Sequence, residues 1–193
     1  MFRITDTDLR LLEFNDLEQV LLWRNSERIR NSMFTSRLIG WEEHVAWFNQ
    51  LQHRKDQAVL LFSYQGVSMG VINYIKINRL KYNCEWGFYI GPEDAAPGSG
   101  TAMGLLGLDY AFKNLAMNTI RGQCFTINTA SIRYHLKLGF VLQKKMTLQA
   151  DNHATNSLVY FFELTKETWE EKRASLYPHI FADYEKVAVG EKK

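Results

Sequence analysis

Apolar residues recur with the spacing of amphipathic helices in four segments of the chain. The first segment follows an apolar, strand-like run at residues 9–14, and Asn15 or Asp16 stands where a helix cap is expected. The second places His44 beside a stripe of aromatic side chains. The fourth ends at Gly139, a residue type that commonly terminates helices. The predicted helices cover residues 17–32, 40–52, 101–115 and 129–138.

Alternation of apolar and polar residues predicts strands in the rest of the chain. Glu85 alternates with apolar neighbours in one of them, so it should point away from the apolar face of its strand. Gly87 indicates either a β-bulge or a backbone that a ligand approaches closely. Three consecutive runs form an antiparallel meander, with a turn at Gln65 and Gly66. The predicted strands after the first cover residues 58–64, 67–80, 82–90, 119–126, 140–148 and 157–164.

This order of helices and strands predicts a mixed α/β (α+β) domain built on one central sheet. A length of 193 residues and a hydrophobic content of 46% are sufficient for a substantial core. We expect a single domain at residues 1–169 and a helical or solvated tail at 170–193, where the composition changes. The polar stretch at 149–156 is predicted to be a loop between the last two strands.

Charge and cysteine content exclude several classes of function. A net charge of +2, with basic and acidic residues interleaved, does not predict a nucleic-acid-binding surface. No stretch approaches the roughly 18 apolar residues of a membrane span, and the N-terminus does not resemble an export signal. Cys84 and Cys124 lack the spacing of zinc ligands or of a disulfide framework, so no metal site is predicted. We expect a cytoplasmic protein with small-molecule partners, and its oligomeric state, including a homodimer, is left open.

Three polar features have the chemistry of a functional site. Asn128, Ser131 and His135 share one face of a predicted helix, and an imidazole, with an ordinary pKa of about 6.5, is suited to proton transfer near neutrality. Glu85 is either a general base in a cleft or a strand residue that meets water. The Pro-Gly-Ser-Gly loop at 97–100 either binds a phosphate through its backbone amides or forms a plain turn. Each feature taken singly also has a structural explanation.

Together these features resemble the GNAT family of N-acetyltransferases over nearly the whole chain. The matching parts are a strand at 82–90 that leads through the glycine-rich loop into a helix, and the pattern NxxSxxxxxKxGF at 128–140. The resemblance implies a central, mixed and mostly antiparallel sheet flanked by helices, with splayed strands at an acetyl-CoA site. It therefore implies acetyl-CoA as the cofactor.

The same resemblance assigns roles to individual residues. The loop amides would hold the pyrophosphate of the cofactor, the preceding strand would pair with its pantetheine, and the helix that follows would flank its thiol. Glu85 would deprotonate the acceptor amine, directly or through a water, and His135 would protonate the leaving thiolate. Transfer would be direct, in a ternary complex, without a metal or a covalent enzyme intermediate. The implied cofactor-binding residues are Phe88, Tyr89, Ile90, Gly98, Ser99, Gly100, Thr101, Asn128, Ser131 and Lys137.

Two positions depart from the family pattern. Ala95 stands where the family usually has Gln or Arg, so the phosphates would be held by other groups, such as Lys137 or Arg133. His135 stands where the family often has a tyrosine that protonates the thiolate. Because an imidazole can also donate a proton, the role of an acid is kept for His135.

Within the family, the segment at 23–51 is similar to the acetyltransferases of pseudaminic acid biosynthesis in its Arg-Asn pair, its IRxxM pattern and its EHxxWF pattern. Those enzymes acetylate the 4-amino group of a UDP-linked 4-amino-4,6-dideoxy-N-acetylaltrosamine, in the assembly of flagellin and surface glycans. By this resemblance Arg24 and His44 would contact the nucleotide diphosphate, assisted by Lys76 and Tyr89. The implied apolar wall against the 6-methyl group of the sugar consists of Met33, Phe34 and Phe48.

Two other functions fit parts of the pattern. The Arg-Asn helix and the NxxSxxxxxKxGF helix also occur in acetyltransferases of ribosomal-protein N-termini, which would need an acidic or open peptide groove. A non-catalytic coenzyme A-binding or scaffold domain would be favoured if Glu85 and His135 pointed away from any cleft. The basic and aromatic residues of the inferred acceptor site favour the nucleotide sugar.

Overall fold

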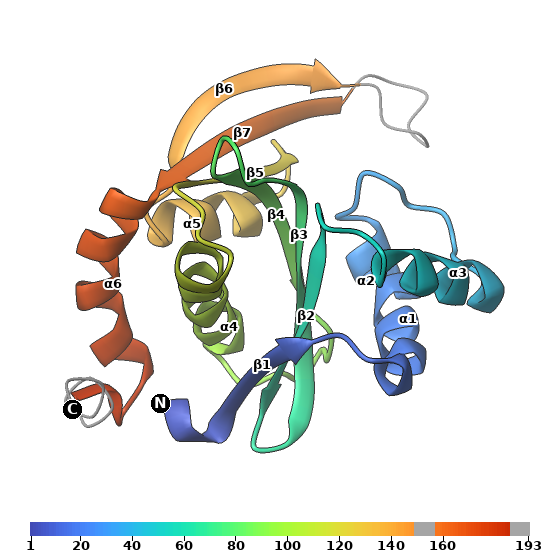
Figure 1. The fold of residues 1–193 in the computed structure, drawn as a ribbon, viewed down its shortest axis with the longest axis horizontal. Coiled ribbons are helices and arrows are strands. Elements are labelled where there is room, and N and C mark those ends of the chain that lie inside the picture. The colour runs from blue at the N-terminus through green and yellow to red at the C-terminus, as the bar shows by residue number, and fades with distance from the viewer. Residues whose placement is uncertain (149–156, 186–193) are drawn as a thin grey trace.

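The computed structural model describes residues 1–148 and 157–185, which form a seven-stranded sheet with helices on both faces (Figure 1). The predicted loop at 149–156 lies outside the described residues. The strands are β1 (Thr7–Leu11), β2 (Ala58–Tyr64), β3 (Val67–Asn78), β4 (Asn83–Ile90), β5 (Thr119–Phe125), β6 (Val141–Leu148) and β7 (Ser157–Thr165). The α-helices are α1 (Leu17–Asn25), α2 (Glu27–Arg30), α3 (Trp41–Leu51), α4 (Ser99–Asp109), α5 (Thr129–Lys137) and α6 (Lys166–Ile180).

The strands lie in the order β1-β2-β3-β4-β5-β7-β6, and each neighbouring pair is antiparallel except β4 and β5. This confirms the mixed, mostly antiparallel sheet, and the predicted meander is found as β2, β3 and β4. The first strand begins and ends earlier than predicted. The Asp16 carboxylate accepts hydrogen bonds from the Glu13 amide (2.8 Å) and the Arg10 guanidinium (2.7 and 2.8 Å), which closes residues 13–16 into a turn.

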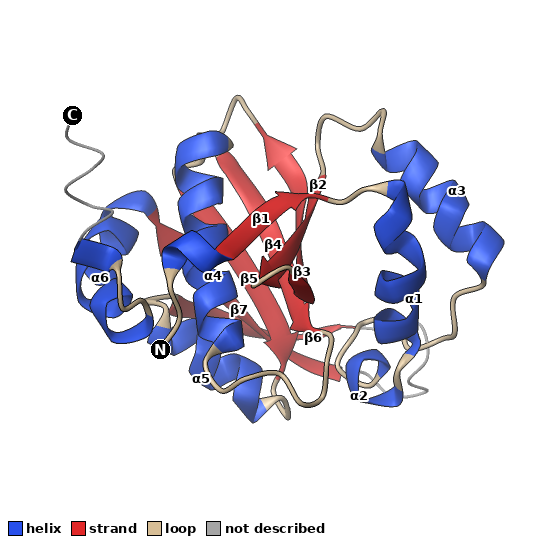
Figure 2. Ribbon diagram, turned by 90° about the horizontal axis from the view of Figure 1, so that it is seen from below, coloured by secondary structure: helices blue, strands red, loops and turns tan. Residues whose placement is uncertain are grey.

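The two faces of the sheet form separate cores. Leu60, Ile72 and Trp86 pack with side chains of α4 and α6 on one face. Val59 and Val71 pack with side chains of α1 and α3 on the other. Figure 2 shows the same division, with α4, α5 and α6 on one side of the sheet and α1, α2 and α3 on the other. The division follows from the alternation of side chains along each strand.

The helix predicted at residues 17–32 is interrupted. It consists of α1 and α2, separated at Ser26, whose backbone is extended (φ −60°, ψ 142°). The Ser26 hydroxyl donates a hydrogen bond to the Trp23 carbonyl (2.8 Å), so the side chain caps the end of α1. Asn25 then fixes the loop after α2, because its side-chain amide exchanges two hydrogen bonds with the backbone of Ile39 (2.8 and 2.9 Å).

Strands β4 and β5 separate after a short paired stretch, as the family resemblance implied. They are paired only where Asn83 to Glu85 of β4 lies beside β5. From Trp86 to Ile90, the edge of β4 that faces β5 has no strand partner among the described residues. Backbone amides and carbonyls on such an edge can bind a ligand. The Ile90 carbonyl is already bonded, because it accepts a hydrogen bond from the Arg28 guanidinium (2.9 Å).

The C-terminal segment packs as part of the domain as far as it is described. Helix α6 crosses the expected boundary at residue 169 and buries Trp169 and Tyr177 in the core shared with α4. Beyond it, the Asp183 carboxylate accepts a hydrogen bond from the Ile4 amide (2.7 Å). The helix expected in the tail from residue 170 is found as far as Ile180, whereas its expected separation from the domain is corrected, because these aromatic side chains and the Asp183 contact hold the segment against the domain. Residues 186–193 lie outside the described residues.

Three further features concern the described ranges only. None of the helices found there is both long enough and apolar enough to cross a bilayer. The side chains of Cys84 and Cys124 are buried free thiols, and burial raises the pKa of both. Within residues 1–148 and 157–185, no three His, Cys, Asp or Glu side chains are grouped so that they could hold a metal ion.

Candidate active site

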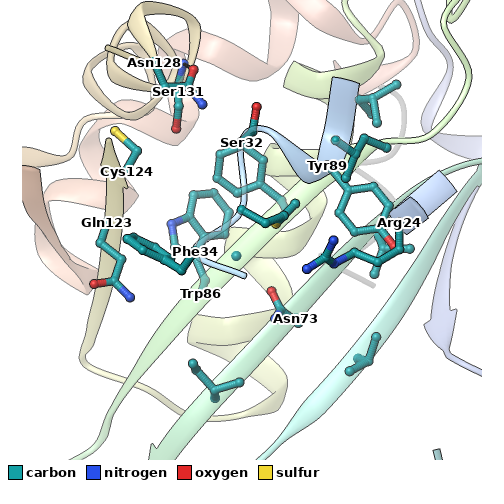
Figure 3. A pocket seen from close by; sticks show the side chains of 18 of the residues that line it. Arg24, Ser32, Phe34, Asn73, Trp86, Tyr89, Gln123, Cys124, Asn128 and Ser131 are labelled. Atoms are coloured by element: carbon teal, nitrogen blue, oxygen red, sulfur yellow. Dashed lines mark hydrogen bonds between the residues drawn. The ribbon is translucent and has the colours of Figure 1, made fainter. Parts of the chain in front are cut away.

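A cavity of about 690 Å³ lies against the sheet where β4 leaves β5. Its walls come from α1, α2, α3 and the intervening loop on one side, and from β3, β4, β5, α4 and α5 on the other. In Figure 3, Arg24 and Tyr89 lie at one end of the cavity, Asn73 lies near its middle, and Cys124 and Asn128 lie at the other end. The volume is within the usual range for a small-molecule site.

Most of the residues predicted for the site line this cavity. They are Arg24, Met33, Phe34, His44, Glu85, Phe88, Tyr89, Ile90, Gly100, Asn128, Ser131 and His135. Three more, Gly98, Ser99 and Thr101, lie at the start of α4, and Lys137 reaches the same turn. Because Glu85 and His135 both line the cavity, the geometry that would have favoured a non-catalytic scaffold is not found.

The expected apolar wall is only partly formed by the predicted residues. Met33 and Phe34 line the cavity, and the Phe34 ring packs on that of Phe125 with 4.8 Å between the ring centroids. Phe48 instead lies in the core cluster formed by α1, α3 and the sheet, with 7% of its surface exposed. The expected ligand contact of Phe48 is therefore corrected, and Trp86, which belongs to the core on the other face of the sheet, is an aromatic lining residue that was not predicted.

Arg24 is a half-buried cation in the cavity wall. Its Nη2 donates a hydrogen bond to the Thr35 carbonyl (2.6 Å), whereas its Nη1 is buried without a hydrogen-bond partner among the described residues. Burial lowers the pKa of Arg24, but a guanidinium remains charged at neutral pH. Arg30 makes a similar bond to the Ser36 carbonyl (2.9 Å) and does not line the cavity. Arg24 thus provides a positive charge with an unused donor.

His44 lines the cavity as a neutral polar group. It is 4% exposed, and its ring stacks on that of Trp47 with 5.1 Å between the centroids. Burial lowers the pKa of His44, which keeps the imidazole neutral near pH 7. Its Nε2 has no hydrogen-bond partner in the described part of the chain. His44 can therefore exchange a hydrogen bond with a ligand, but it does not add charge.

Glu85 lines the cavity from β4 and is held on one side by a lysine. Its Oε1 accepts a hydrogen bond from the Lys76 ammonium (2.8 Å), and its Oε2 is buried without a partner among the described residues. The Lys76 side chain is 71% exposed and does not line the cavity. Lys76, which was expected to contact the ligand, is therefore bonded to the Glu85 carboxylate instead.

His135 is buried at the point where β4 and β5 separate, and both of its ring nitrogens are bonded. Nδ1 lies 2.8 Å from the Ser131 carbonyl, so it carries the proton, and Nε2 accepts a hydrogen bond from the Trp86 indole (3.3 Å). The ring stacks on Phe162, and a Cβ at Gly122 would collide with it. Burial lowers the pKa of His135 to about 4. A neutral ring with its one proton bonded to a carbonyl has none to donate, which argues against the expected role as an acid.

The first turn of α4 combines free space with positive charge. Gly98 caps the helix in a left-handed conformation (φ +97°), which disfavours a side chain at this position. The Lys137 ammonium donates a hydrogen bond to the Thr101 hydroxyl (3.1 Å) and so lies beside this turn. It brings a cation to the loop in which Ala95 replaces the family's polar side chain. Arg133, the alternative source of a cation, is exposed on α5.

Asn73 is a lining residue that sequence reasoning missed. The register of β3 and β4 pairs it with Gly87, where an added Cβ would lie 2.5 Å from Asn73 Oδ1. The bulge considered for Gly87 is not there, because the register shift falls later, between Ile75 and Asn78. Gly87 instead makes room for the Asn73 amide, which makes no side-chain hydrogen bond within the described residues. Only the strand register identifies this pair.

Tyr134 was also missed, although it adjoins the predicted acid. Its hydroxyl donates a hydrogen bond to the Gly100 carbonyl (2.6 Å), which ties α5 to the first turn of α4. A Cβ at Gly104 would collide with the same hydroxyl, so the glycine allows the two helices to pack closely. Burial raises the pKa of Tyr134. The residue holds the two helices together at the loop where the phosphate site is expected.

Comparison with known proteins identifies the family. A family model described as an acetyltransferase (GNAT) domain matches residues 7–141. The chain belongs to the GNAT acetyltransferase family. It is similar to acetyltransferase PseH of Campylobacter jejuni subsp. jejuni serotype O:23/36 (strain 81-176), with 26% identity over 131 residues that cover 68% of this chain and 80% of PseH.

Solved GNAT structures share the fold. The spermidine N-acetyltransferase of Vibrio cholerae in complex with CoA and spermine has a TM-score of 0.80 at 20% identity, over 86% of this chain and 99% of that enzyme. The same kind of enzyme from Vibrio cholerae in complex with manganese ions has a TM-score of 0.74 at 19% identity, over 87% of this chain and 97% of its own. At these identities the likeness concerns the fold alone.

As a GNAT enzyme, the protein is an N-acetyltransferase that uses acetyl-CoA, and its residues fit this cofactor. The free edge of β4 from Trp86 to Ile90 can pair with the pantetheine amides. The start of α4 has the positive end of the helix dipole and backbone amides for the pyrophosphate. A Cβ at Gly100 would meet nothing nearer than 3.7 Å, so the turn is open to a ligand. Lys137 adds a cation beside it.

The geometry of His135 leads to a prediction about stability. His135→Phe should destabilise the protein by about 1–3 kcal/mol at pH 7, because the Trp86 indole N–H loses its buried acceptor. The folded-state pKa of about 4 lies below the ordinary 6.5, so the wild type loses stability as the pH falls through this range. The variant has no histidine at this position and does not lose stability in this way. The difference in free energy of unfolding between the wild type and the variant should therefore be about 2 kcal/mol smaller at pH 5 than at pH 7.

Urea unfolding of both proteins at pH 7 and pH 5 measures this difference, with the exposed His53→Phe as the control. His135→Phe should keep its turnover number, per folded molecule, within about tenfold of the wild type. A stable His135→Phe enzyme whose turnover number is lowered by about 10² to 10⁴ would instead restore the histidine as the acid.

Proposed function

We propose that the protein acetylates the 4-amino group of a UDP-linked amino-dideoxy sugar in pseudaminic acid biosynthesis, a step in the assembly of flagellin or surface glycans. The observation that carries this proposal is the charge of the acceptor end of the cavity. Arg24 presents a charged guanidinium with an unused donor. The two carboxylates among the described lining residues are already paired, Glu43 with Arg37 and Glu85 with Lys76.

This pattern favours an anionic acceptor. A diphosphate complements an unpaired guanidinium, because charge-assisted hydrogen bonds to phosphate oxygens are strong. A polyamine would need carboxylates for several ammonium groups, and a peptide would need an acidic or open groove. Both lining carboxylates are ion-paired with basic side chains, which leaves only Glu85 Oε2 for a single amine. The fold is shared with spermidine N-acetyltransferases, but a fold does not assign an acceptor.

The apolar lining supports the sugar part of the proposal. Met33, Phe34 and Trp86 offer a thioether and two aromatic surfaces, which suit a methyl group better than a hydroxyl group. The segment at 23–51 resembles the acetyltransferases of pseudaminic acid biosynthesis, and the similarity to PseH agrees with this resemblance. The unpaired Asn73 amide can bind a polar substituent of the same sugar.

In this proposal the chain itself performs binding and proton transfer. Glu85 accepts a proton from the acceptor ammonium at Oε2 and leaves a neutral, nucleophilic amine. Bound acetyl-CoA would supply the acetyl group as a thioester, and coenzyme A would leave as the thiolate and take up the second proton that the acceptor nitrogen loses. Backbone amides between Phe88 and Ile90, in the part of β4 that is not paired with β5, would polarise the carbonyl group of the thioester. Asn128 fixes the start of α5 beside the cavity, because its side chain accepts a hydrogen bond from the Ser131 amide (3.0 Å).

Arg24→Met tests the anionic acceptor. The substitution should raise the Michaelis constant for the UDP-amino sugar by about 10- to 100-fold, the worth of a hydrogen bond to a charged group, and leave that for acetyl-CoA unchanged. Arg30→Met is the matched control, because Arg30 binds the neighbouring carbonyl of the same loop and does not line the cavity. Equal effects of the two variants would mean that Arg24 only supports the loop, and the proposal would lose its main evidence.

A further inference from the structure

Strand β3, which pairs with the strand β4 that carries Glu85, contains a local distortion. Ile75 pairs with Glu85 and Asn78 with Asn83, so two residues of β3 face one residue of β4 between these pairs. The distortion is a β-bulge, and Lys76 within it has a left-handed backbone (φ 53°). Residues with a side chain beyond Cα disfavour this conformation, and it is found where the surroundings enforce it.

The bulge changes the direction of the Lys76 side chain. Opposite residues of paired strands project from the same face, so Ile75 and Glu85 both line the cavity. In a regular strand the next residue, Lys76, would project from the other face of the sheet, away from Glu85. With the bulge, its ammonium lies 2.8 Å from Glu85 Oε1. The unfavourable backbone thus coincides with a contact that a regular strand would not make.

The contact with Lys76 makes the two oxygens of the Glu85 carboxylate different. Oε1 is bonded to Lys76, whereas Oε2 is buried without a partner among the described residues. Glu85 has 25% of its side-chain surface exposed and lines the cavity. A carboxylate fixed through one oxygen has a defined orientation for the other, which is a requirement for efficient proton transfer.

We propose that Lys76 is a positioning residue for Glu85, and that the bulge exists to bring its ammonium to Oε1. This inference rests on the proposed role of Glu85 as the base and replaces the expected contact of Lys76 with the acceptor. One proton passes from the acceptor nitrogen to Oε2, and the nitrogen keeps the electron pair. Lys76 itself neither gains nor loses a proton.

Steady-state kinetics with Lys76→Met, Lys76→Arg and Glu85→Gln, singly and combined, test the proposal. Lys76→Met should lower the turnover number by about 5- to 50-fold, an effect of the size found for residues in contact, with the Michaelis constant for the acceptor within about threefold of the wild type. Lys76→Arg should restore most of the activity. Lys81→Met, an exposed lysine just after the bulge, is the control and should be neutral.

The double variant gives the decisive result. If Lys76 acts through Glu85, adding Lys76→Met to Glu85→Gln should leave the turnover number unchanged. Independent, multiplicative losses would overturn the proposal, and so would a raised acceptor Michaelis constant with an unchanged turnover number, which would place Lys76 on the acceptor. The series uses whichever amine the wild type acetylates best, so a wrong sugar assignment would be seen separately in the choice of acceptor. Thermal unfolding of each variant excludes loss of folding as the cause.

Discussion

Glu85→Gln is expected to lower the turnover number by about 10² to 10⁴, the usual contribution of a general base, with small changes in both Michaelis constants. The amide has the shape of the carboxylate and can still accept the Lys76 hydrogen bond, but it does not take up a proton at neutral pH. The remaining activity should rise about tenfold per pH unit, because without a base only the fraction of acceptor amine that is already unprotonated in solution can react, and that fraction rises with pH. A pH series of initial rates measures both effects.

Glu163→Gln is the matched control for this experiment. Glu163 is also an ion-paired strand carboxylate, bonded to Arg121 on the adjacent strand (3.0 Å), and it does not line the cavity. Its replacement should leave the turnover number within about twofold, as for most surface ion pairs. Wild-type activity of Glu85→Gln would show that the base is another group or water, and the proposed proton transfer would be wrong.

Gly100→Asp is expected to weaken acetyl-CoA binding by about 100-fold, since it places a negative charge in the first turn of α4, where the pyrophosphate is expected. The position tolerates a side chain sterically, because the nearest atom to an added Cβ is 3.7 Å away and the backbone is not left-handed. Isothermal titration calorimetry with coenzyme A measures the change.

Gly100→Asn separates charge from size in this test. It has nearly the volume of aspartate without the charge, so its loss of affinity should be clearly smaller than that of Gly100→Asp. Equal losses of affinity for coenzyme A would mean that the added side chain acts through its size and not through its charge. An unchanged affinity of Gly100→Asp would place the pyrophosphate away from α4.

Much of the fold could be predicted because it depends on local patterns. The alternation around Glu85 placed β4 and its polar face, and the NxxSxxxxxKxGF pattern placed α5 next to it. The break between α1 and α2 was not predicted. Ser26 caps α1 through a local bond, but the loop after α2 is held by Asn25 bonded to Ile39, a contact that the helical pattern does not show. The packing of α6 was missed for the same reason, since Trp169 and Tyr177 are buried against α4, which lies far from them in the sequence.

The sequence predicted which residues form the candidate site better than it predicted the contacts between them. Sequence reasoning found Glu85, His135 and Arg24, which line one cavity. It could not find that Trp86 bonds to the His135 ring, because the contact crosses 49 residues. It also could not find the Asn73 amide, which depends on the strand register. These relations decide whether a titratable side chain is free to react.

A thiol-release assay with acetyl-CoA shows whether the acceptor is an anionic amino sugar. The acceptors are UDP-4-amino-4,6-dideoxy-N-acetylaltrosamine, the same amino sugar without the nucleotide, spermidine, and peptides with free N-termini. We expect efficient release of coenzyme A with the UDP-linked sugar, and much less with the free sugar, spermidine and the peptides. Preferred acetylation of spermidine or of a peptide would contradict the proposed acceptor.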